Sequence, residues 1–246
     1  MPLFNETDPI RAVVVGASGG IGQAVTGRLL SHAGVAHVDA VARNPRPVRH
    51  SRMSVHQADM LDGDALARVA DAIARAGPVH LVMITTGILH GDRFGPEKSM
   101  RQIEAETMAH LFRVNSIGPA MVARHFLPLM ARDRPGVFAA LSARVGSISD
   151  NRIGGWVSYR ASKAALNQIL KTLSIEQARR NSQTVVMGLH PGTVDTALSD
   201  PFQAHVPQSQ LFSPDHAARC LLDVVNAATP EQTGRVYDWA GAEVPP

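Results

Sequence analysis

The chain has 246 residues, of which 45% are apolar and 18% are charged, a composition typical of a globular protein with one large α/β domain. Its net charge of +3 comes without a run rich in lysine and arginine, so the sequence lacks the clustered basic surface typical of nucleic-acid binding. Its first ten residues have no basic start and no apolar core typical of a signal peptide, and no apolar run reaches about eighteen residues. We therefore expect a cytoplasmic protein that does not span a membrane. Cys220 is the only cysteine, which excludes an intrachain disulfide and a CxxC metal site, and we predict no metal ion.

Short apolar runs alternate with longer helical patterns along the whole chain. The predicted strands, in chain order, are residues 11–15, 35–42, 53–57, 79–84, 136–141, 184–189 and 235–238. The predicted helices are residues 20–31, 62–76 with Asp62 as its N-cap, 103–132 and 158–180, and a last helix begins near Pro214. The strands are apolar throughout, as strands covered on both faces should be. The pattern predicts a single doubly wound α/β domain of the Rossmann type over residues 1–246, with a mostly parallel sheet.

The first predicted strand runs directly into a glycine-rich turn at residues 16–22, GASGGIG, and a predicted helix follows. Glycines there permit a tight turn, and the start of the helix offers free N–H groups and a positive dipole end to a pyrophosphate. A glycine cluster can also be an ordinary turn, but its position between a buried strand and a helix favours dinucleotide binding. The expected contacts in this turn are Gly16, Ser18, Gly19, Gly20, Ile21 and Gly22.

The end of the second predicted strand favours NADP(H) over NAD(H). An acidic side chain at this place binds the 2′-hydroxyl of the ribose, whereas an arginine accommodates a 2′-phosphate. The strand ends in Ala42-Arg43-Asn44, and Asp39 lies four residues before Arg43, too early to reach the ribose. We therefore predict that Arg43 pairs with the 2′-phosphate, the alternative being a solvated surface arginine.

Tyr159 and Lys163 form a candidate catalytic pair at the start of the long predicted helix 158–180. Four residues apart, they lie on one helix face with their Cβ atoms about 5–6 Å apart. A phenol with a pKa of about 10 is a poor acid–base catalyst at neutral pH, and a nearby ammonium is expected to lower that pKa. Lys163 could also bind ribose hydroxyls. Taken alone, the spacing YxxxK favours an ordinary exposed tyrosine–lysine pair.

The motifs, taken together, resemble the short-chain dehydrogenase/reductase family over nearly the whole chain. GASGGIG resembles its glycine motif and YRASK at 159–163 its YxxxK motif, while Asp59 resembles the aspartate that contacts adenine. Asn115 resembles the helix asparagine that anchors a proton-relay water, and the segment 191–196 resembles the stretch that lines the nicotinamide site. Residues 143–167 are most similar to the C-factor and sniffer-type carbonyl reductases. Beyond the glycine turn and Arg43, the implied cofactor contacts are Asp59, Met60, Thr85, Thr86, Gly87, Tyr159, Lys163, Pro191, Gly192, Val194 and Thr196.

Two segments depart from the family pattern. The usual NNAG segment is replaced by residues 84–87, ITTG, in which Thr85 and Thr86 still offer backbone and hydroxyl contacts. After the fifth predicted strand, alignment places Ala143 where the family has its catalytic serine. Either Ser142 or Ser147 supplies that hydroxyl or the role is missing, and we predict Ser142. Losing such a donor typically costs about 10²–10³ in rate, so activity would be reduced rather than abolished.

The resemblance implies an NADP(H)-dependent oxidoreductase that reduces a ketone or aldehyde to an alcohol, with Tyr159 as general acid assisted by Lys163, Asn115 and Ser142. The expected partner is thus a small carbonyl or alcohol substrate. The alternative is a non-catalytic or weakly active dinucleotide-binding sensor or signalling protein of the same fold.

Three further features concern the surroundings of this site. Residues 197–212, polar and punctuated by proline, are predicted to form a substrate lid. Trp156, Val157 and His90 are candidate pocket residues, with core packing an equally good interpretation of each. Small residues on the helix after Tyr159 permit close helix packing and fit a homodimer or homotetramer, although a monomer with internally packed helices is also possible; they are Ala161, Ala164 and Ala165.

Overall fold

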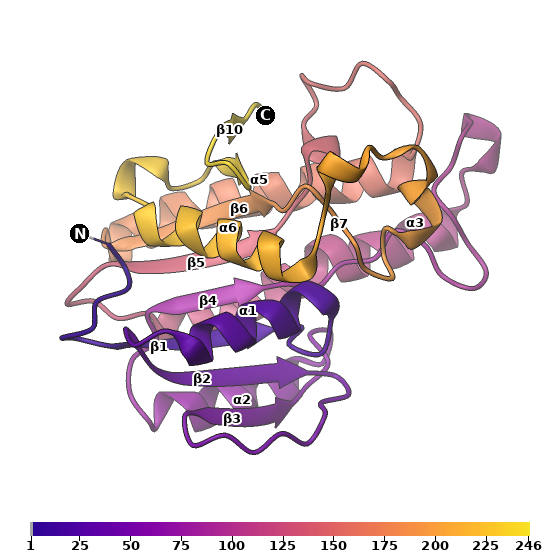
Figure 1. Cartoon of the computed structure of the whole chain (residues 1–246). Helices are drawn as coiled ribbons and strands as arrows, with labels where there is room; N and C mark the ends of the chain where they lie inside the picture. The colour runs from indigo at the N-terminus through magenta and orange to yellow at the C-terminus, as the bar shows by residue number, and fades with distance from the viewer. Residues whose placement is uncertain (1) are drawn as a thin grey trace.

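The structure, a computed structural model, describes residues 2–246 and is built on an eight-stranded sheet in the order β10-β9-β6-β5-β4-β1-β2-β3 (Figure 1). The strands are β1 (Ile10–Val15), β2 (Val35–Ala42), β3 (Met53–Gln57), β4 (Leu81–Ile84), β5 (Gly136–Leu141), β6 (Thr184–His190), β9 (Val236–Asp238) and β10 (Glu243–Val244). Neighbouring strands are parallel except for β10, which pairs antiparallel with β9. From β1 the chain adds strands first on one side, to β2 and β3, and then on the other, beginning with β4. Doubly wound folds bind their ligands at this switch point between β1 and β4. The predicted fold is confirmed.

Helices cover both faces of the sheet. They are α1 (Gly20–Ser31), α2 (Gly63–Ala74), α3 (Ala105–Phe112), α4 (Gly118–Phe126), α5 (Val157–Arg180) and α6 (Pro214–Ala227). Figure 1 shows α1 and α6 in front of the sheet, whereas α2 and α5 lie behind it. Two apolar cores follow from this arrangement, one between the sheet and α1 with α6, the other between the sheet and α2, α4 and α5.

Strand β1 shows why its sequence is apolar at every position. Val13 and Val15 belong to the core under α2, α4 and α5, while Ala12 and Val14 belong to the core under α1 and α6. All four are at most 3% exposed. Successive side chains of a strand point to opposite faces, so a strand covered on both faces must be apolar throughout.

The predicted helix over residues 103–132 is helical from residue 105 to residue 129, but it is not a regular α-helix. The structure has α3, a π-helical turn at Arg113–Ile117, α4 and a 3₁₀ turn at Leu127–Leu129. Pro119 lies in the first turn of α4 and has no N–H to donate to the carbonyl of Asn115, so a regular α-helical ladder cannot pass this point. Elsewhere the ends differ by a few residues, and the predicted cap is confirmed: the Asp62 carboxylate accepts from the N–H of Ala65 at 3.0 Å.

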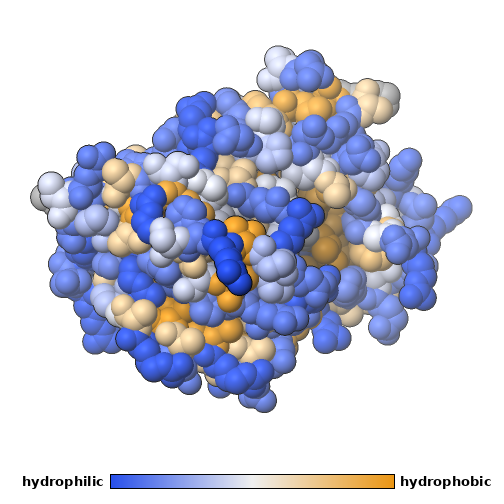
Figure 2. Space-filling model, turned by 60° about the horizontal axis from the view of Figure 1, so that its bottom comes forward, coloured by the Kyte–Doolittle hydropathy of each residue, from blue (hydrophilic) through white to orange (hydrophobic). Residues whose placement is uncertain are grey.

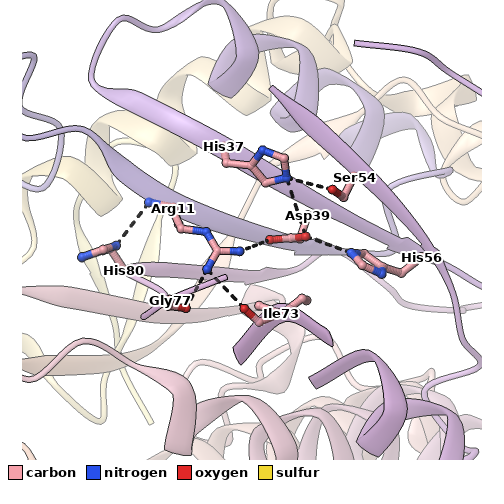
Figure 3. A network of polar contacts seen from close by, with 8 residues as sticks. All are labelled: Arg11, His37, Asp39, Ser54, His56, Ile73, Gly77 and His80. Atoms are coloured by element: carbon pink, nitrogen blue, oxygen red, sulfur yellow. Dashed lines mark hydrogen bonds and ion pairs between the residues drawn. The ribbon is translucent and has the colours of Figure 1, made fainter. Parts of the chain in front are cut away.

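Asp39 is the centre of a polar network that links β1, β2 and β3 to the end of α2 (Figure 3). Its carboxylate accepts from the guanidinium of Arg11 at 3.0 Å and contacts the ring of His56 at 2.8 Å. Arg11 also donates to the carbonyls of Ile73 and Gly77, which ties the end of α2 to β1 and β2. The carboxylate is therefore engaged within the fold, consistent with the expectation that Asp39 does not reach the ribose.

The surface near β3 is mostly polar, with apolar residues gathered in separate small patches (Figure 2). Val48 and Val55 are among the exposed apolar residues of the chain, at 54% and 37% exposure. Scattered exposed apolar residues are normal on a folded protein. Over the described part of the chain, no helix is both long and apolar enough to cross a membrane.

Candidate active site

The turn between β1 and α1 is shaped so that only glycine fits at its two ends. Gly16 has φ +88°, and a Cβ there would approach the side chains of Thr85 and Thr86 to 2.9 and 2.8 Å. A Cβ on Gly22 would lie 2.2 Å from the carbonyl oxygen of Gly16. The N-cap, Gly19, places no side chain over the helix start, and the first turn of α1 holds no acidic residue. The first N–H groups of α1 are thus open to an anion, and the turn fits a dinucleotide pyrophosphate.

A cavity of about 470 Å³ extends from this turn along the ends of β1, β2 and β4. Its lining includes many of the predicted cofactor contacts: Gly16, Ser18, Gly19, Arg43, Asp59, Met60, Thr85, Thr86 and Gly87. Arg43 is exposed, and its guanidinium has no ion-pair partner among residues 2–246, so it is free to bind a phosphate. The hydroxyls of Thr85 and Thr86 contact the carbonyl of Val15 at 2.9 Å and the sulfur of Met60 at 3.3 Å.

A second cavity, of about 550 Å³, lies on the other side of the α1 N-terminus. It brings together the other half of the predicted site: Ile21, Ser142, Tyr159, Pro191, Gly192, Val194 and Thr196. Gly20 faces this side of the turn as well, since a Cβ there would touch Thr196 at 2.9 Å. The two cavities flank one helix N-terminus, as the two ends of a dinucleotide require.

Tyr159 and Lys163 lie in the first two turns of α5, with the ammonium nitrogen 6.0 Å from the centre of the phenol ring. Lys163 donates to the carbonyl of Leu141 at 2.8 Å and is 2% exposed. Burial raises the pKa of Tyr159 to about 12 and lowers the pKa of Lys163 to about 8. The expectation that the ammonium lowers the tyrosine pKa is therefore wrong for the cofactor-free protein, because the cost of burying a phenolate is the larger effect.

The buried amine makes stability depend on pH. The pKa of Lys163 is about 8 in the folded protein against an ordinary 10.5, so between these values the unfolded chain binds more protons and the free energy of unfolding rises with pH. We expect wild type to gain about 2 kcal/mol relative to Lys163→Met between about pH 7.5 and about pH 10, measured by urea unfolding without cofactor. The control Lys171→Met, at an exposed position of the same helix, should show no such slope. A flat difference for Lys163→Met would contradict the burial of the charge.

Asn115 lies in the π-helical turn and is fully buried. Its side-chain oxygen accepts from the N–H of Ile88 at 2.9 Å, and its amide nitrogen donates to the Ile88 carbonyl at 2.9 Å and the Ser162 hydroxyl at 3.0 Å. Asn115 therefore joins the segment after β4 to α5. A Cβ on Gly87 would lie 3.6 Å from the Asn115 oxygen and 3.5 Å from the Lys163 nitrogen, so the three residues share one neighbourhood.

The two candidate serines lie in different surroundings, and Ala143 occupies the aligned position of the family serine. Ala143 lines the cavity and packs in one apolar cluster with Tyr159. Ser142 also lines the cavity, but its hydroxyl donates to the side-chain oxygen of Asn167 at 2.6 Å. Ser147 is outside the lining, and its hydroxyl donates to the carbonyl of Pro246 at 3.3 Å. The methyl group of Ala143 thus takes the place next to the phenol, and Ser142 remains the predicted donor.

Residues 197–212 cover part of the cavity. They contain 3₁₀ turns at Asp200–His205 and Gln208–Gln210 and the strand β8 (Leu211–Phe212), which pairs with β7 (Thr193–Val194). Leu198 and Phe202 line the cavity together with Trp156. His90 lies outside the lining and contacts the carbonyl of Ala197 at 3.1 Å, and Val157 is 37% exposed.

His190 is a cavity residue that the sequence did not single out. It ends β6, lines the cavity, and its ring Nδ1 is buried without a hydrogen-bond partner in the described part of the chain. Burial, with a smaller effect of Arg144, lowers the pKa of His190 to about 4, so the imidazole is neutral at pH 7. The sequence contains no pattern around His190 that would have predicted a buried histidine in the cavity wall.

The doubly wound sheet and the glycine turn flanked by two cavities are typical of dinucleotide-binding α/β proteins. A family model described as short chain dehydrogenase matches residues 11–207, and the chain belongs to that family. It is similar to C-signal of Myxococcus xanthus, 32% identical over 169 residues that cover 69% of this chain and 93% of that protein. Carbonyl reductase Sniffer of D. melanogaster has a TM-score of 0.84 and 20% identity, and NADPH-bound carbonyl reductase from chicken fatty liver 0.83 and 22%; each match covers 96% of this chain and 99% of the other. The predicted family is confirmed.

Proposed function

We propose that the protein is an NADP(H)-dependent reductase that converts a ketone or aldehyde to an alcohol, with Tyr159 as the proton donor. The observation that carries the proposal is the position of the Tyr159 phenol. It lines a cavity that also contains the residues expected around a nicotinamide, on the opposite side of the α1 N-terminus from Arg43. A bound nicotinamide supplies hydride chemistry at this place.

The protein's own residues hold and deliver the proton. Because burial raises the pKa of Tyr159 to about 12, the phenol is protonated at neutral pH and can donate to a carbonyl oxygen. Lys163 and Asn115 fix the geometry behind it, one through the carbonyl of Leu141 and the other through Ile88. Ser142 is the proposed second donor. We propose that its hydroxyl proton turns from the side-chain oxygen of Asn167 to the substrate carbonyl oxygen, where a donor stabilises the charge that develops.

The lining of the second cavity suggests the kind of substrate. Apolar and aromatic side chains form much of its wall: Leu89, Val145, Ile153, Trp156, Leu198, Phe202 and Val206. Such a wall binds apolar or aromatic groups by burying their surface. We therefore propose a carbonyl compound with an apolar body as substrate, with residues 197–212 as its lid.

A panel assay tests the activity. NADPH oxidation is followed with aldehydes and ketones that carry aryl or alkyl groups, and the alcohols are identified as products, with NADPH binding measured in parallel by fluorescence. Turnover with alcohol formation supports the proposal. Binding of NADPH without turnover of any carbonyl would favour the second candidate, a dinucleotide-binding sensor, for which the alanine beside Tyr159 is the favouring observation.

Cofactor preference is tested at Arg43. Arg43→Asp should lower kcat/KM for NADPH relative to NADH by about 100-fold, because a charge-assisted contact to the 2′-phosphate is replaced by repulsion. The matched control Arg49→Asp changes an exposed arginine of the same loop and should leave the ratio unchanged. An unchanged ratio in Arg43→Asp would show that this arginine does not read the phosphate.

We further propose a homodimer or homotetramer packed through α4 and α5. Ile117, just before α4, and Ile175 on α5 are 48% and 49% exposed, and Ala161, Ala164 and Ala165 are only half-buried in the single chain. An apolar, small-residue surface of this kind permits two helices to approach closely.

A further inference from the structure

Glu97 is a buried acid that no part of the proposed mechanism uses. It lies in the segment between β4 and α3, is 3% exposed, and is not part of either cavity wall. Its two carboxylate oxygens each lie 3.3 Å from the backbone nitrogen of Ser158, and one of them also accepts from the Ser158 hydroxyl. Its backbone carbonyl accepts from the N–H of Trp156 at 2.6 Å. Glu97 thus binds the start of α5 through both its main chain and its side chain.

The helix that carries Tyr159 has no cap of its own. Its N-cap, Trp156, makes no side-chain capping bond, and the first turn contains no acidic residue. The first N–H groups of a helix need partners, and a negative charge near them is stabilising. The carboxylate of Glu97 meets both needs from a different segment of the chain.

The backbone before α5 is held in an unusual conformation. Gly154, Gly155 and Trp156 have φ values of +71°, +67° and +53°, and Trp156 is the only non-glycine residue with positive φ in the described part of the chain. A bulky residue in this region is strained and persists only where its surroundings hold it. The hydrogen bond from Trp156 to Glu97 is one of the contacts that hold it.

This turn places two side chains of the substrate cavity. The centre of the Trp156 ring lies 6.3 Å from that of the Tyr159 ring and 5.3 Å from that of the Phe202 ring. Trp156 thus packs between the proposed proton donor and the lid segment. Ser158, which Glu97 binds, is directly before Tyr159. Any shift of this first turn moves the phenol and the indole together.

We propose that Glu97 is a positioning residue that fixes Tyr159 and Trp156 in the cavity by capping α5 from outside the helix. The proposal rests on the proposed reductase function for its kinetic consequences, but its structural consequence does not depend on turnover. The proposal adds a residue to those of the proposed mechanism. Glu97 lines neither cavity and acts only through Ser158 and Trp156.

Steady-state kinetics of Glu97→Ala and Glu97→Gln test the proposal, with an aryl ketone or aldehyde found active in the panel assay. Glu97→Ala should lower kcat by about 10- to 100-fold, the size expected for a misplacement of about 1 Å, while the Kd for NADPH stays unchanged. Glu97→Gln keeps an acceptor oxygen of the same reach and should recover most of kcat. The matched control Glu104→Ala, at an exposed acid of the same segment, should behave as wild type.

Tryptophan fluorescence gives a readout without turnover. The chain has two tryptophans, so in a Trp239→Phe background the emission reports Trp156 alone. Glu97→Ala should shift this emission to the red and increase its quenching by iodide, and Glu97→Gln should restore it. Wild-type kcat and emission in a folded Glu97→Ala protein would overturn the proposal.

A second variant covers the case in which Glu97→Ala does not fold. Ser158→Ala removes the hydroxyl that donates to Glu97 and keeps the backbone contact, so it should reduce kcat and shift the Trp156 emission in the same direction by less. If Ser158→Ala matches wild type in both kcat and emission, the proposal is overturned. A wild-type protein that reduces no carbonyl would refute the proposed function instead, and the emission shift would still decide the role of Glu97.

Discussion

Tyr159→Phe should lower kcat for carbonyl reduction by about 10³-fold or more, because it removes the hydroxyl that gives its proton to the substrate oxygen and leaves the ring in place. NADPH binding should be almost unchanged, since the adenosine half of the proposed site lies in the other cavity. Single-turnover kinetics at saturating NADPH, with the Kd measured by fluorescence, separates the two quantities. Lys171→Met, which changes an exposed residue further along α5, serves as the control.

The pKa values sharpen this prediction. With the pKa of Tyr159 at about 12, the cofactor-free enzyme keeps the proton on the phenol throughout the neutral range. Loss of reduction as pH rises past about 8 would therefore follow the deprotonation of Lys163 rather than of the tyrosine. Turnover by Tyr159→Phe at the wild-type rate would show that another group supplies the proton.

Asp39→Ala should destabilise the folded protein by about 3–5 kcal/mol, because it leaves the largely buried guanidinium of Arg11 without its counter-ion. The two side chains are 14% and 4% exposed, so little water can replace the lost partner. Urea unfolding of the cofactor-free protein measures the change. The exposed pair of Arg219 and Asp223 provides a control, and Asp223→Ala should change the free energy of unfolding by less than about 1 kcal/mol.

A double variant tests the cause of that loss. Arg11→Met together with Asp39→Ala removes both charges, and we expect it to be more stable than Asp39→Ala alone, because no unpaired charge remains buried. If Asp39→Ala alone cost less than about 1 kcal/mol, the network of Figure 3 would not hold β1, β2 and α2 together in the way described.

The sequence predicted the sheet well because its strands carry a signal of their own. A run such as residues 11–15 has no polar alternation, a composition typical of a strand covered on both faces. The sequence did not reveal the π-helical turn within residues 103–132, because the apolar pattern continues through Pro119 and hides the effect of the missing N–H. The periodicity of apolar residues indicates which helix face is buried. It does not indicate whether the backbone hydrogen bonds keep the regular α-helical spacing.

The sequence likewise predicts the local features of the site but not those that depend on distant parts of the chain. The glycine turn and the Tyr-Lys spacing are local patterns that the sequence can predict, and the folded chain places the turn and Tyr159 at two adjoining cavities. The direction of the Tyr159 pKa shift could not be foreseen, because it depends on burial by residues distant in sequence. The role of Glu97 could not be predicted for the same reason, because its partner Ser158 is 61 residues away and an isolated glutamate belongs to no sequence motif.

Transfer of deuterium tests the central claim, that the nicotinamide site and the Tyr159 phenol meet in one cavity. NADPH carrying deuterium at one of the two positions of nicotinamide C4 is mixed with an active ketone, and the alcohol is examined by mass spectrometry and NMR. We predict that one of the two labelled forms delivers its deuterium to the carbinol carbon, as a single enantiomer, while the other delivers none. Deuterium from both forms, a racemic product, or label lost to water would contradict a fixed cavity in which hydride and proton reach the same carbonyl.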